Sequence, residues 1–419
     1  MSADLQPMAV APQALGEYAP AAGVEALERV RAAAEPLRGA RIAHVSAAAT
    51  GGRVPELLAS LLPLQADLGL LVEWRVLFGG PELRAGVGAL HDGAQGAETA
   101  LGLESWSAYL DDCQAASQQL GEGFDAIVLH DPGTLGLAAA VAAGTNLWRC
   151  HVDASGAEPE TRDRVVELSS SCDGIIVAHD SFAPEELRGP RLHAVAPGID
   201  PLGARNLELA PRLAGRLVRP HGVDLSRPFI FQPMRLDRWK DPHATIEAFA
   251  LAKAELPDLQ LVIAGALDEA ITEEWLAAKE VSDYASARED VRLVTSYDRI
   301  GDLELGALQR LARLTVHGAI REGFGLAASE ALWKGTPVVG RSEGGLPLQV
   351  RDGVDGYLTE SEEDTAARVV ELVGDPGLAV EMGRAGRQRV RERFLVTRAL
   401  EDELAALASV LGAGTVGRP

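Results

Sequence analysis

Two carboxylates frame a glycine-rich turn in the second half of the chain. The stretch REGFGLAASE, residues 321–330, places Glu322 and Glu330 eight positions apart, with Gly323 and Gly325 between them. Glycines let a ligand approach the backbone, and the first amides of the helix expected next favour an anion. Carboxylates accept hydrogen bonds from hydroxyls, so the turn suits a ligand with an anionic part and a hydroxyl-rich part. The alternative is a solvated helix N-terminus with acidic neighbours.

Two cations follow an earlier expected strand of the same half. In MRLDRWKDP, residues 234–242, Arg235 and Lys240 lie five positions apart across a turn, and the chain has only four lysines. A guanidinium fork and an ammonium point charge can together hold a pyrophosphate. Combined with the acidic turn, they provide a phosphate clamp, a helix N-terminus and hydroxyl acceptors. The combination predicts a nucleotide-sugar site.

Short apolar runs alternate with longer helical patterns along the whole chain. In the first half, strands are expected at residues 41–46, 72–78, 125–130, 146–152, 174–179 and 192–197, and helices near 54–68, 104–120, 135–144 and 160–170. The pattern then restarts, with strands expected at 228–234, 259–265, 291–296, 313–318 and 336–340. Apolar strands separated by helices indicate parallel sheets that are covered on both faces.

The restart predicts an α/β protein with two doubly wound, Rossmann-like domains that face each other across a cleft. A length of 419 residues suits two domains of about 100–200 residues each. We expect the first domain at 1–208, with a loose lead-in before its first helix, and the second at 209–392. Residues 198–228 are expected to connect them. A last helix within 393–419 has a docking site that the sequence leaves open.

Composition excludes several classes of partner. The formal net charge of −22 repels phosphate backbones and anionic lipid, so neither nucleic acid nor a membrane is expected. The three cysteines, Cys113, Cys150 and Cys172, are widely spaced and form no CxxC pair, which favours a reducing compartment. The start of the chain has no basic, apolar leader, and we expect a cytoplasmic protein. No D-x-D occurs, and no metal site is expected.

The second-half motifs resemble the donor site of retaining GT-B glycosyltransferases of family four, with Glu322 and Glu330 as their E-x7-E pair. Four stretches of the first half narrow the resemblance to the trehalose synthase branch. They are HVSAAATGGRVPELL (44–58), LHDP (129–132), WRCHVDAS (148–155) and APGIDP (196–201). The resemblance covers roughly residues 41–358. It implies the GT-B fold and transfer of a hexose, most simply glucose, from a nucleotide diphosphate sugar, with no tightly bound cofactor.

The resemblance also implies a role for each matching residue. Arg235 and Lys240 would neutralise the diphosphate, and Glu322 would hold hydroxyls of the donor sugar. His151 would reach that sugar near the reacting carbon, and Glu330 would accept from the ribose. The remaining donor contacts would come from Gly51, Gly52, Gly323, Phe324, Gly325 and Leu326. In such enzymes the leaving phosphate takes the acceptor proton on the same face, so the glutamates bind rather than act as an acid/base pair.

The first half departs from the branch where the acceptor binds. The third glycine of the first loop is replaced by Arg53, the usual Gln-Pro after HDP is Gly133-Thr134, and a usual His-Asn is His91-Asp92. These changes leave the identity of the acceptor open. Arg53 would recognise an anionic acceptor such as a sugar phosphate, or it would form an exposed pair with Glu56, which we prefer.

Three further residues are expected at the acceptor. His130 and Asp131 end an expected strand, and Asp153 would either orient His151 or cap the next segment. His44 ends the first strand and is either a packed core histidine or a site residue. The nucleotide base is left open, although residues 295–299 are expected to line its pocket.

Two rivals to glycosyl transfer share these features. A trehalose-type phosphorylase would bind free phosphate at the same site, and a non-catalytic sugar-binding homologue would keep the fold without the chemistry. A nicotinamide dehydrogenase is set aside because no GxGxxG follows a strand with an acidic residue about 20 positions on. The expected partners are therefore small molecules, a nucleotide diphosphate sugar and a sugar or sugar phosphate. A homodimer is left open.

Overall fold

The chain folds into two compact α/β units. The computed structural model describes residues 3–50, 52–99, 102–141, 144–233, 238–265 and 272–416. Unit 1 comprises Met1–Gly198 and Val396–Pro419, and unit 2 comprises Ile199–Leu395. The expected domains 1–208 and 209–392 therefore differ from the units by ten residues at the first crossing and three at the second. The last helix, left unassigned by the sequence, belongs to unit 1.

Unit 1 is built on a seven-stranded sheet with the order β1-β3-β2-β4-β5-β6-β7. Its strands are β1 (Asp4–Met8), β2 (Arg41–Ser46), β3 (Leu71–Phe78), β4 (Ala126–His130), β5 (Thr145–Arg149), β6 (Gly174–Val177) and β7 (Leu192–Ala194). All neighbours are parallel except β1, which runs antiparallel to β3. The chain places β3 on one side of β2 and β4 on the other, so the direction of winding reverses between β2 and β4.

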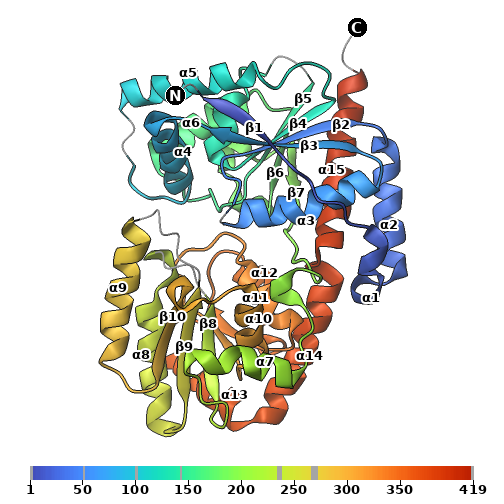
Figure 1. Cartoon of the computed structure of the whole chain (residues 1–419). Helices are drawn as coiled ribbons and strands as arrows, with labels where there is room; N and C mark the ends of the chain where they lie inside the picture. The colour runs from blue at the N-terminus through green and yellow to red at the C-terminus, as the bar shows by residue number, and fades with distance from the viewer. Residues whose placement is uncertain are drawn as a thin grey trace. The chain divides into compact units, whose positions relative to one another are not determined.

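Helices cover this sheet in two groups (Figure 1). They are α1 (Ala19–Ala22), α2 (Val24–Ala34), α3 (Arg53–Asp67), α4 (Pro81–Ala94), α5 (Leu103–Ser117), α6 (Pro159–Ser169) and α15 (Val396–Val416). One group contains α2, α3 and α15, and the other contains α4, α5 and α6. The terminal helix α15 lies along α2, where Arg29 and Glu401 form an ion pair of 3.2 Å.

Unit 2 has a fully parallel six-stranded sheet with the order β10-β9-β8-β11-β12-β13. Its strands are β8 (Phe229–Pro233), β9 (Gln260–Gly265), β10 (Val291–Thr295), β11 (Thr315–His317), β12 (Val338–Arg341) and β13 (Gly356–Thr359). Its helices are α7 (Pro211–Val218), α8 (Pro242–Glu255), α9 (Thr272–Ser286), α10 (Asp302–Leu311), α11 (Leu326–Trp333), α12 (Leu346–Gln349), α13 (Glu362–Gly374) and α14 (Pro376–Arg393).

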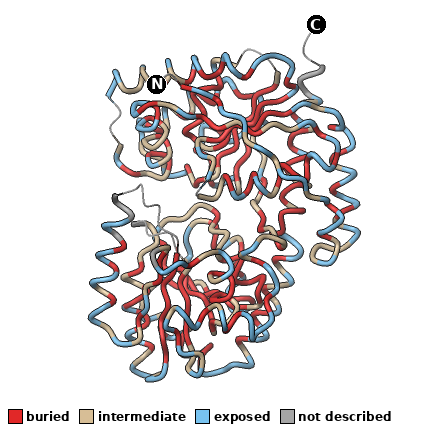
Figure 2. Tube along the Cα trace, viewed as in Figure 1, coloured by how far each residue is buried: buried red, intermediate tan, exposed pale blue. Residues whose placement is uncertain are grey.

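The strands of unit 2 are buried on both faces, as their near-continuous apolar sequences require. Along β8, Ile230 packs into the core beside α8, α9 and α13, whereas Phe229 and Phe231 pack into the core beside α7 and α10. Figure 2 shows the buried residues of each unit concentrated on its strands and the inner faces of its helices. Both units are therefore three-layered, with a sheet between helices.

The structure differs from the sequence expectations at several elements. The lead-in contains the strand β1, and the segment 198–228, expected as a connection, contains α7, which packs against α10 within unit 2. The described part of the alanine-rich segment, residues 135–141, does not form the expected α-helix. A 3₁₀-helix spans Pro132–Leu137 instead, because two glycines lower the helical propensity there. The elements α4 and β13 were not predicted.

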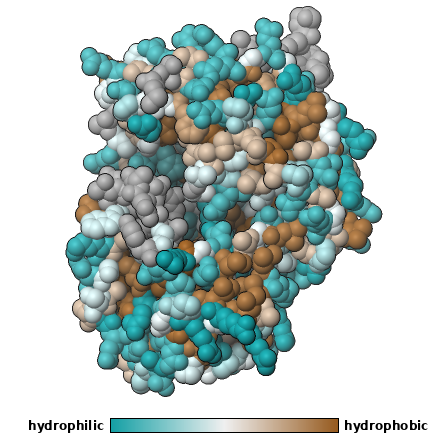
Figure 3. Space-filling view, in the orientation of Figure 1, coloured by the Kyte–Doolittle hydropathy of each residue, from teal (hydrophilic) through white to brown (hydrophobic). Residues whose placement is uncertain are grey.

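Hydrophilic side chains cover much of the visible surface of both units, with apolar side chains in smaller groups between them (Figure 3). Within the described ranges, no helix combines the length and the apolarity that a bilayer crossing requires.

Candidate functional site

The polar loops of unit 2 meet where the winding of its sheet reverses. The chain moves outward from β8 to β9 and β10, then returns to the other side of β8 with β11, which pairs with β8 through Thr315 and Phe231. In open parallel sheets, ligands bind at the carboxyl ends of strands at such a reversal. The loops that follow β8 and β11 carry Lys240 and Glu322. The strand order therefore places these two side chains at one edge of the sheet.

Lys240 and Glu322 form an ion pair, with Lys240 Nζ donating to Glu322 Oε1. Each side chain is about one-fifth exposed, at 19% and 20%. The two loops are also joined through the backbone, since the amide of Ile320 donates to the carbonyl of Trp239 at 2.9 Å. A cation and a carboxylate therefore share one point of the surface. The second expected cation, Arg235, lies outside the described residues.

Gly325 is required by the geometry of the acidic turn. It has φ +75°, in the left-handed region, and forms the N-cap of α11. A Cβ atom at this position would lie 3.0 Å from Glu322 Cγ and 3.1 Å from Cδ. The missing side chain lets Glu322 fold back over the start of the helix. Gly325 itself has no side chain with which to cap the start of α11.

Gln349 of α12, which is fully buried, fastens this turn to the helix. Its Nε2 donates to the carbonyls of Phe324, Gly325 (3.3 Å) and Gly345 (3.2 Å). Its Oε1 accepts from the amide and hydroxyl of Ser329, at 3.0 and 2.6 Å. One amide side chain therefore satisfies both the turn carbonyls and an early α11 amide.

Glu330 is buried, with a side chain only 5% exposed, and faces Arg205. Arg205 Nη1 lies 3.5 Å from Glu330 Oε1, and the same guanidinium donates to Asp302 at 2.5 and 3.0 Å. Arg205 belongs to the segment 198–228. The carboxylate expected to accept from a ribose is thus already oriented by a cation.

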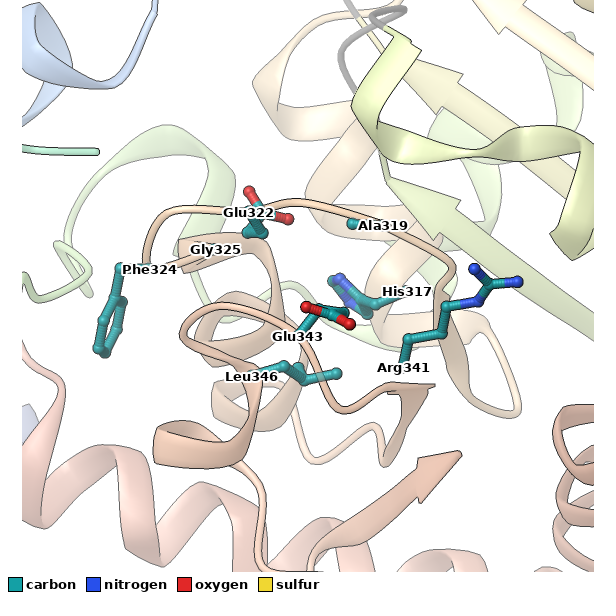
Figure 4. A pocket seen from close by; sticks show the side chains of 8 residues that line it. All are labelled: His317, Ala319, Glu322, Phe324, Gly325, Arg341, Glu343 and Leu346. Atoms are coloured by element: carbon teal, nitrogen blue, oxygen red, sulfur yellow. The ribbon is translucent and has the colours of Figure 1, made fainter. Parts of the chain in front are cut away.

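A concavity of about 240 Å³, open solvent included, adjoins the acidic turn (Figure 4). It is lined by His317, Ala319, Glu322, Phe324, Gly325, Arg341, Glu343 and Leu346. In Figure 4, Glu322 and Glu343 come from different turns, and the ring of Phe324 points away from His317. That ring packs edge-on against Phe394, with centroids 5.6 Å apart. Phe324 therefore contributes its backbone to the turn and its side chain to the core.

His317 ends β11 beside both glutamates. Burial lowers the pKa of His317 to about 4, although the negative charges of Glu322 and Glu330 raise it in part. The imidazole is therefore neutral at neutral pH. It offers a polar but uncharged wall next to the Lys240 and Glu322 pair.

Unit 1 brings three histidines together at its own reversal of winding. His130, at the end of β4, bonds through Nδ1 to His151 Nε2 at 2.9 Å and through Nε2 to His44 Nδ1 at 3.0 Å. Asp131 has φ 67°, and its carboxylate accepts from the amide of His151 at 3.2 Å. Burial raises the pKa of Asp131. His44 is therefore linked to two expected site residues, His130 and His151.

Arg53, Asp153 and the first loop show simpler contacts. Arg53 pairs with Glu56 at 3.0 Å, both side chains being well exposed, as in the interpretation that we preferred. Asp153 accepts from Ser155 N and Oγ at 3.0 and 2.6 Å, so its carboxylate caps the following turn instead of orienting His151. Gly52 adopts φ 77° before α3, and Gly51 lies outside the described residues.

Comparisons with known proteins cover the same two units. Residues 216–389 match the family described as glycosyl transferases group 1, and residues 44–184 match the N-terminal domain of trehalose synthase. The chain is 35% identical to a trehalose synthase of Rubrobacter xylanophilus, over 96% of this chain and 98% of that one. The chain belongs to the trehalose synthase family of group 1 glycosyltransferases.

Other relatives of this glycosyltransferase agree with that assignment. A trehalose synthase of Thermococcus litoralis is 31% identical over 94% of this chain and 97% of that one. Among solved structures, a UDP-forming α,α-trehalose-phosphate synthase of Burkholderia xenovorans superposes with a TM-score of 0.70 at 14% identity, covering 89% and 99% of the two chains. Anabaena HepE in complex with UDP and glucose gives 0.64 at 17% identity, covering 88% and 99%. These neighbours establish the GT-B fold that the motifs predicted.

Sequence reasoning missed several residues that organise this glycosyltransferase. His130 was identified because it ends a strand. His317 ends strand β11 in the same way, so the same criterion would have identified it. Gln349 shows no such signal, because its role depends on carbonyls that only the folded turn brings together. Arg205 lies in a segment without periodicity, and it reaches Glu330 only through the fold.

Proposed function

We propose that this glycosyltransferase transfers glucose from a nucleotide diphosphate sugar to a sugar acceptor, with retention of the anomeric configuration. The observation that carries the proposal is the pair of Lys240 and Glu322 at the reversal of winding in unit 2. A diphosphate needs a cation, and a sugar needs hydroxyl acceptors. The site offers both at one point.

Each described residue has a role in this proposal. Lys240 stabilises the diphosphate charge, which grows as the bond to the sugar breaks. Glu322 accepts from donor-sugar hydroxyls, and Glu330, held by Arg205, accepts from the ribose. Gly325 and Leu326 bring backbone amides to the phosphates at the start of α11. The nucleotide sugar is a substrate, and the reaction requires no tightly bound cofactor.

The proposed chemistry needs no protein nucleophile. The bond from the anomeric carbon to the diphosphate oxygen breaks, and the acceptor oxygen bonds to that carbon from the same face. The acceptor proton passes to the leaving phosphate. The protein then contributes orientation and charge stabilisation, each of which can supply several kcal/mol.

Names of relatives support glucose as the transferred sugar. The full-length relatives are trehalose synthases, and Anabaena HepE was solved with UDP and glucose. We therefore propose a nucleoside diphosphate glucose as donor and glucose or a glucose phosphate as acceptor. A trehalose-type disaccharide would be the product.

The test begins with a thermal-shift panel of UDP, ADP and GDP and their glucose derivatives. The best donor is then incubated with glucose and with glucose 6-phosphate, and nucleoside diphosphate release and the product anomer are measured. Release of diphosphate with an α-linked product supports the proposal. Disaccharide cleavage that depends on inorganic phosphate, or no transfer from any donor, contradicts it.

A further inference from the structure

A buried line of polar side chains runs through unit 1 from α15 to His151. We refer to its members as the polar chain: Arg149, Glu403, Gln65, His44, His130 and His151. Consecutive members are joined by an Arg149–Glu403 ion pair and by hydrogen bonds of 2.9–3.1 Å. Five of the six are at most 2% exposed, and only His151 is partly exposed. Such a line inside an apolar core requires every donor to meet an acceptor.

The charged end of the polar chain fixes the direction in which its hydrogen bonds are donated. Arg149 pairs with Glu403, and a carboxylate that faces a guanidinium acts as a hydrogen-bond acceptor. Burial lowers the pKa of Arg149 to about 10, so the guanidinium stays charged at neutral pH. Glu403 Oε1 lies 3.1 Å from the amide nitrogen of Gln65, which must donate. The amide oxygen of Gln65 is therefore turned towards His44.

This direction of hydrogen-bond donation then continues through the three imidazole rings. His44 Nε2 lies 3.1 Å from the Gln65 oxygen, so it carries the proton, and a neutral ring leaves Nδ1 as an acceptor. His130 must donate to that nitrogen from Nε2, and its own Nδ1 must accept from His151 Nε2. The rings lie nearly parallel, at interplanar angles of 28° and 18°. Each neutral ring thus has only one tautomer that satisfies both neighbours.

Burial keeps the rings neutral. It lowers the pKa of His44 to about 3, and it holds the pKa values of His130 and His151 well below their ordinary range, with nearby Arg149 acting in the same direction. A second proton on His44 or His130 would place two donors against each other within the line.

We propose that the carboxylate of Glu403 sets the tautomer of His151 through the polar chain, leaving Nδ1 of His151 as a hydrogen-bond acceptor. The described residues make no hydrogen bond to this nitrogen. Its partner is a substrate hydroxyl, most simply one on the transferred sugar, and this part of the inference rests on the proposed function. His44, His130, Gln65 and Glu403 are positioning residues in this scheme.

The polar chain orients His151 and does not conduct protons. A proton taken up at Nδ1 of His151 would have to leave through Gln65, and an amide has no free proton site to pass it on. His151 consequently binds a hydroxyl without deprotonating it. This agrees with chemistry in which the leaving phosphate, rather than the protein, receives the acceptor proton.

The direct test is a two-bond ¹⁵N–¹H correlation spectrum of the ¹⁵N-histidine-labelled full chain at neutral pH. Rings are assigned with His44→Asn, His130→Asn and His151→Asn. We expect all three in the neutral Nε2-H form. A protonated Nδ1 on His151, or a charged ring, overturns the proposal whether or not sugar transfer is observed.

A variant tests the remote origin of the effect. Gln65→Met removes the amide and keeps the length of the side chain, so the reversed proton order becomes accessible and His151 should show both tautomers. Tyr109→Phe is the matched control, because Tyr109 is fully buried in unit 1 and its hydroxyl bonds to Gly133 and Gly136 outside the polar chain. It should leave all three tautomers unchanged. A single Nε2-H form of His151 in Gln65→Met contradicts the proposal.

Turnover gives a second readout once a donor is known. In Gln65→Met we expect kcat to fall about tenfold, the size of one lost hydrogen bond, with the nucleotide affinity of unit 2 unchanged. An equal loss of nucleoside diphosphate affinity would indicate general misfolding and would count against a positioning role. If no donor is turned over, the proposed function fails while the tautomer measurement still decides the inference.

Discussion

Replacing Gln349 by Met should loosen the acidic turn of unit 2 while leaving its charged residues in place. The side chain is completely buried and bonds to five groups, namely the carbonyls of Phe324, Gly325 and Gly345 and the amide and hydroxyl of Ser329. Methionine has a similar length but offers none of these bonds.

The magnitude follows from the groups left without partners. A buried polar group that loses its partner costs about 1–3 kcal/mol, and the Ser329 amide and the shared turn carbonyls are such groups. Allowing for relaxation, we expect Gln349→Met to lower the free energy of unfolding by about 3 kcal/mol. For a unit of this size that corresponds to a fall in Tm of about 6–12 °C.

The matched control is Gln309→Met in the same unit. Gln309 is as deeply buried, but its Nε2 makes one long bond, 3.3 Å to the carbonyl of Ala327, and its Oε1 has no hydrogen-bond partner in the described part of the chain. This substitution should cost less than about 1 kcal/mol. Thermal unfolding and nucleoside diphosphate affinity are measured for both variants. Equal losses of stability, or unchanged affinity in Gln349→Met, would refute the proposed fastening of the turn.

Three other outcomes are expected. Gly325→Ala should lower the free energy of unfolding by about 1–2 kcal/mol because of the positive φ at this position. It should also weaken donor binding, because the new methyl group displaces Glu322. Thermal unfolding and calorimetric binding measure the two effects, and wild-type donor affinity would contradict the second. Lys240→Met should reduce nucleoside diphosphate affinity at least about tenfold. The control Lys253→Met removes an ion pair with Asp290 and should reduce only stability. Similar affinities for the two variants would be inconsistent with binding of the diphosphate by Lys240. Stability should fall as pH drops from 6.5 towards 5, because the unfolded chain binds a proton at His317 near the ordinary pKa of 6.5, whereas the folded ring does so only near 4. As pH drops through this range, the Tm of His317→Asn should fall less steeply than that of the wild type. Parallel curves of Tm against pH for the two proteins would argue against a contribution of His317.

The architecture was predictable because apolar runs and helical spacing depend on local sequence. Strand positions followed from runs such as residues 259–265, and the last residues of those strands directed attention to the edge of each sheet at which its winding reverses. The elements that failed were those in which local signals are weak. The strand β1 is short and contains a proline, and it pairs with the free edge that β3 offers. The helix α7 lies in a segment with prolines at both ends.

The charged residues of the candidate site could be predicted from the sequence, whereas the buried residues that hold side chains in place could not. Lys240 and Glu322 were identified because a cation, a carboxylate and glycines at strand ends have few structural roles together. Gln65 and Glu403 were overlooked, although each is a polar residue on the apolar stripe of a helix, a position that demands a buried partner. The partner itself cannot be read from the sequence, because the two residues are 338 positions apart.

The two reversals of winding in this chain hold opposite kinds of polar group. The reversal in unit 2 gathers formal charges, a lysine, carboxylates and a helix N-terminus, which suit a diphosphate and its sugar. The reversal in unit 1 gathers neutral imidazoles, and the buried ion pair of Arg149 with Glu403 lies at the other end of the polar chain from His151. An uncharged acceptor can bind a hydroxyl without attracting or repelling the charge that develops on a leaving phosphate. Linking three histidines in a line, two of them fully buried, is costly unless every proton has a fixed place. In the proposed scheme, Glu403 is buried because its carboxylate sets which nitrogen of each ring carries the proton.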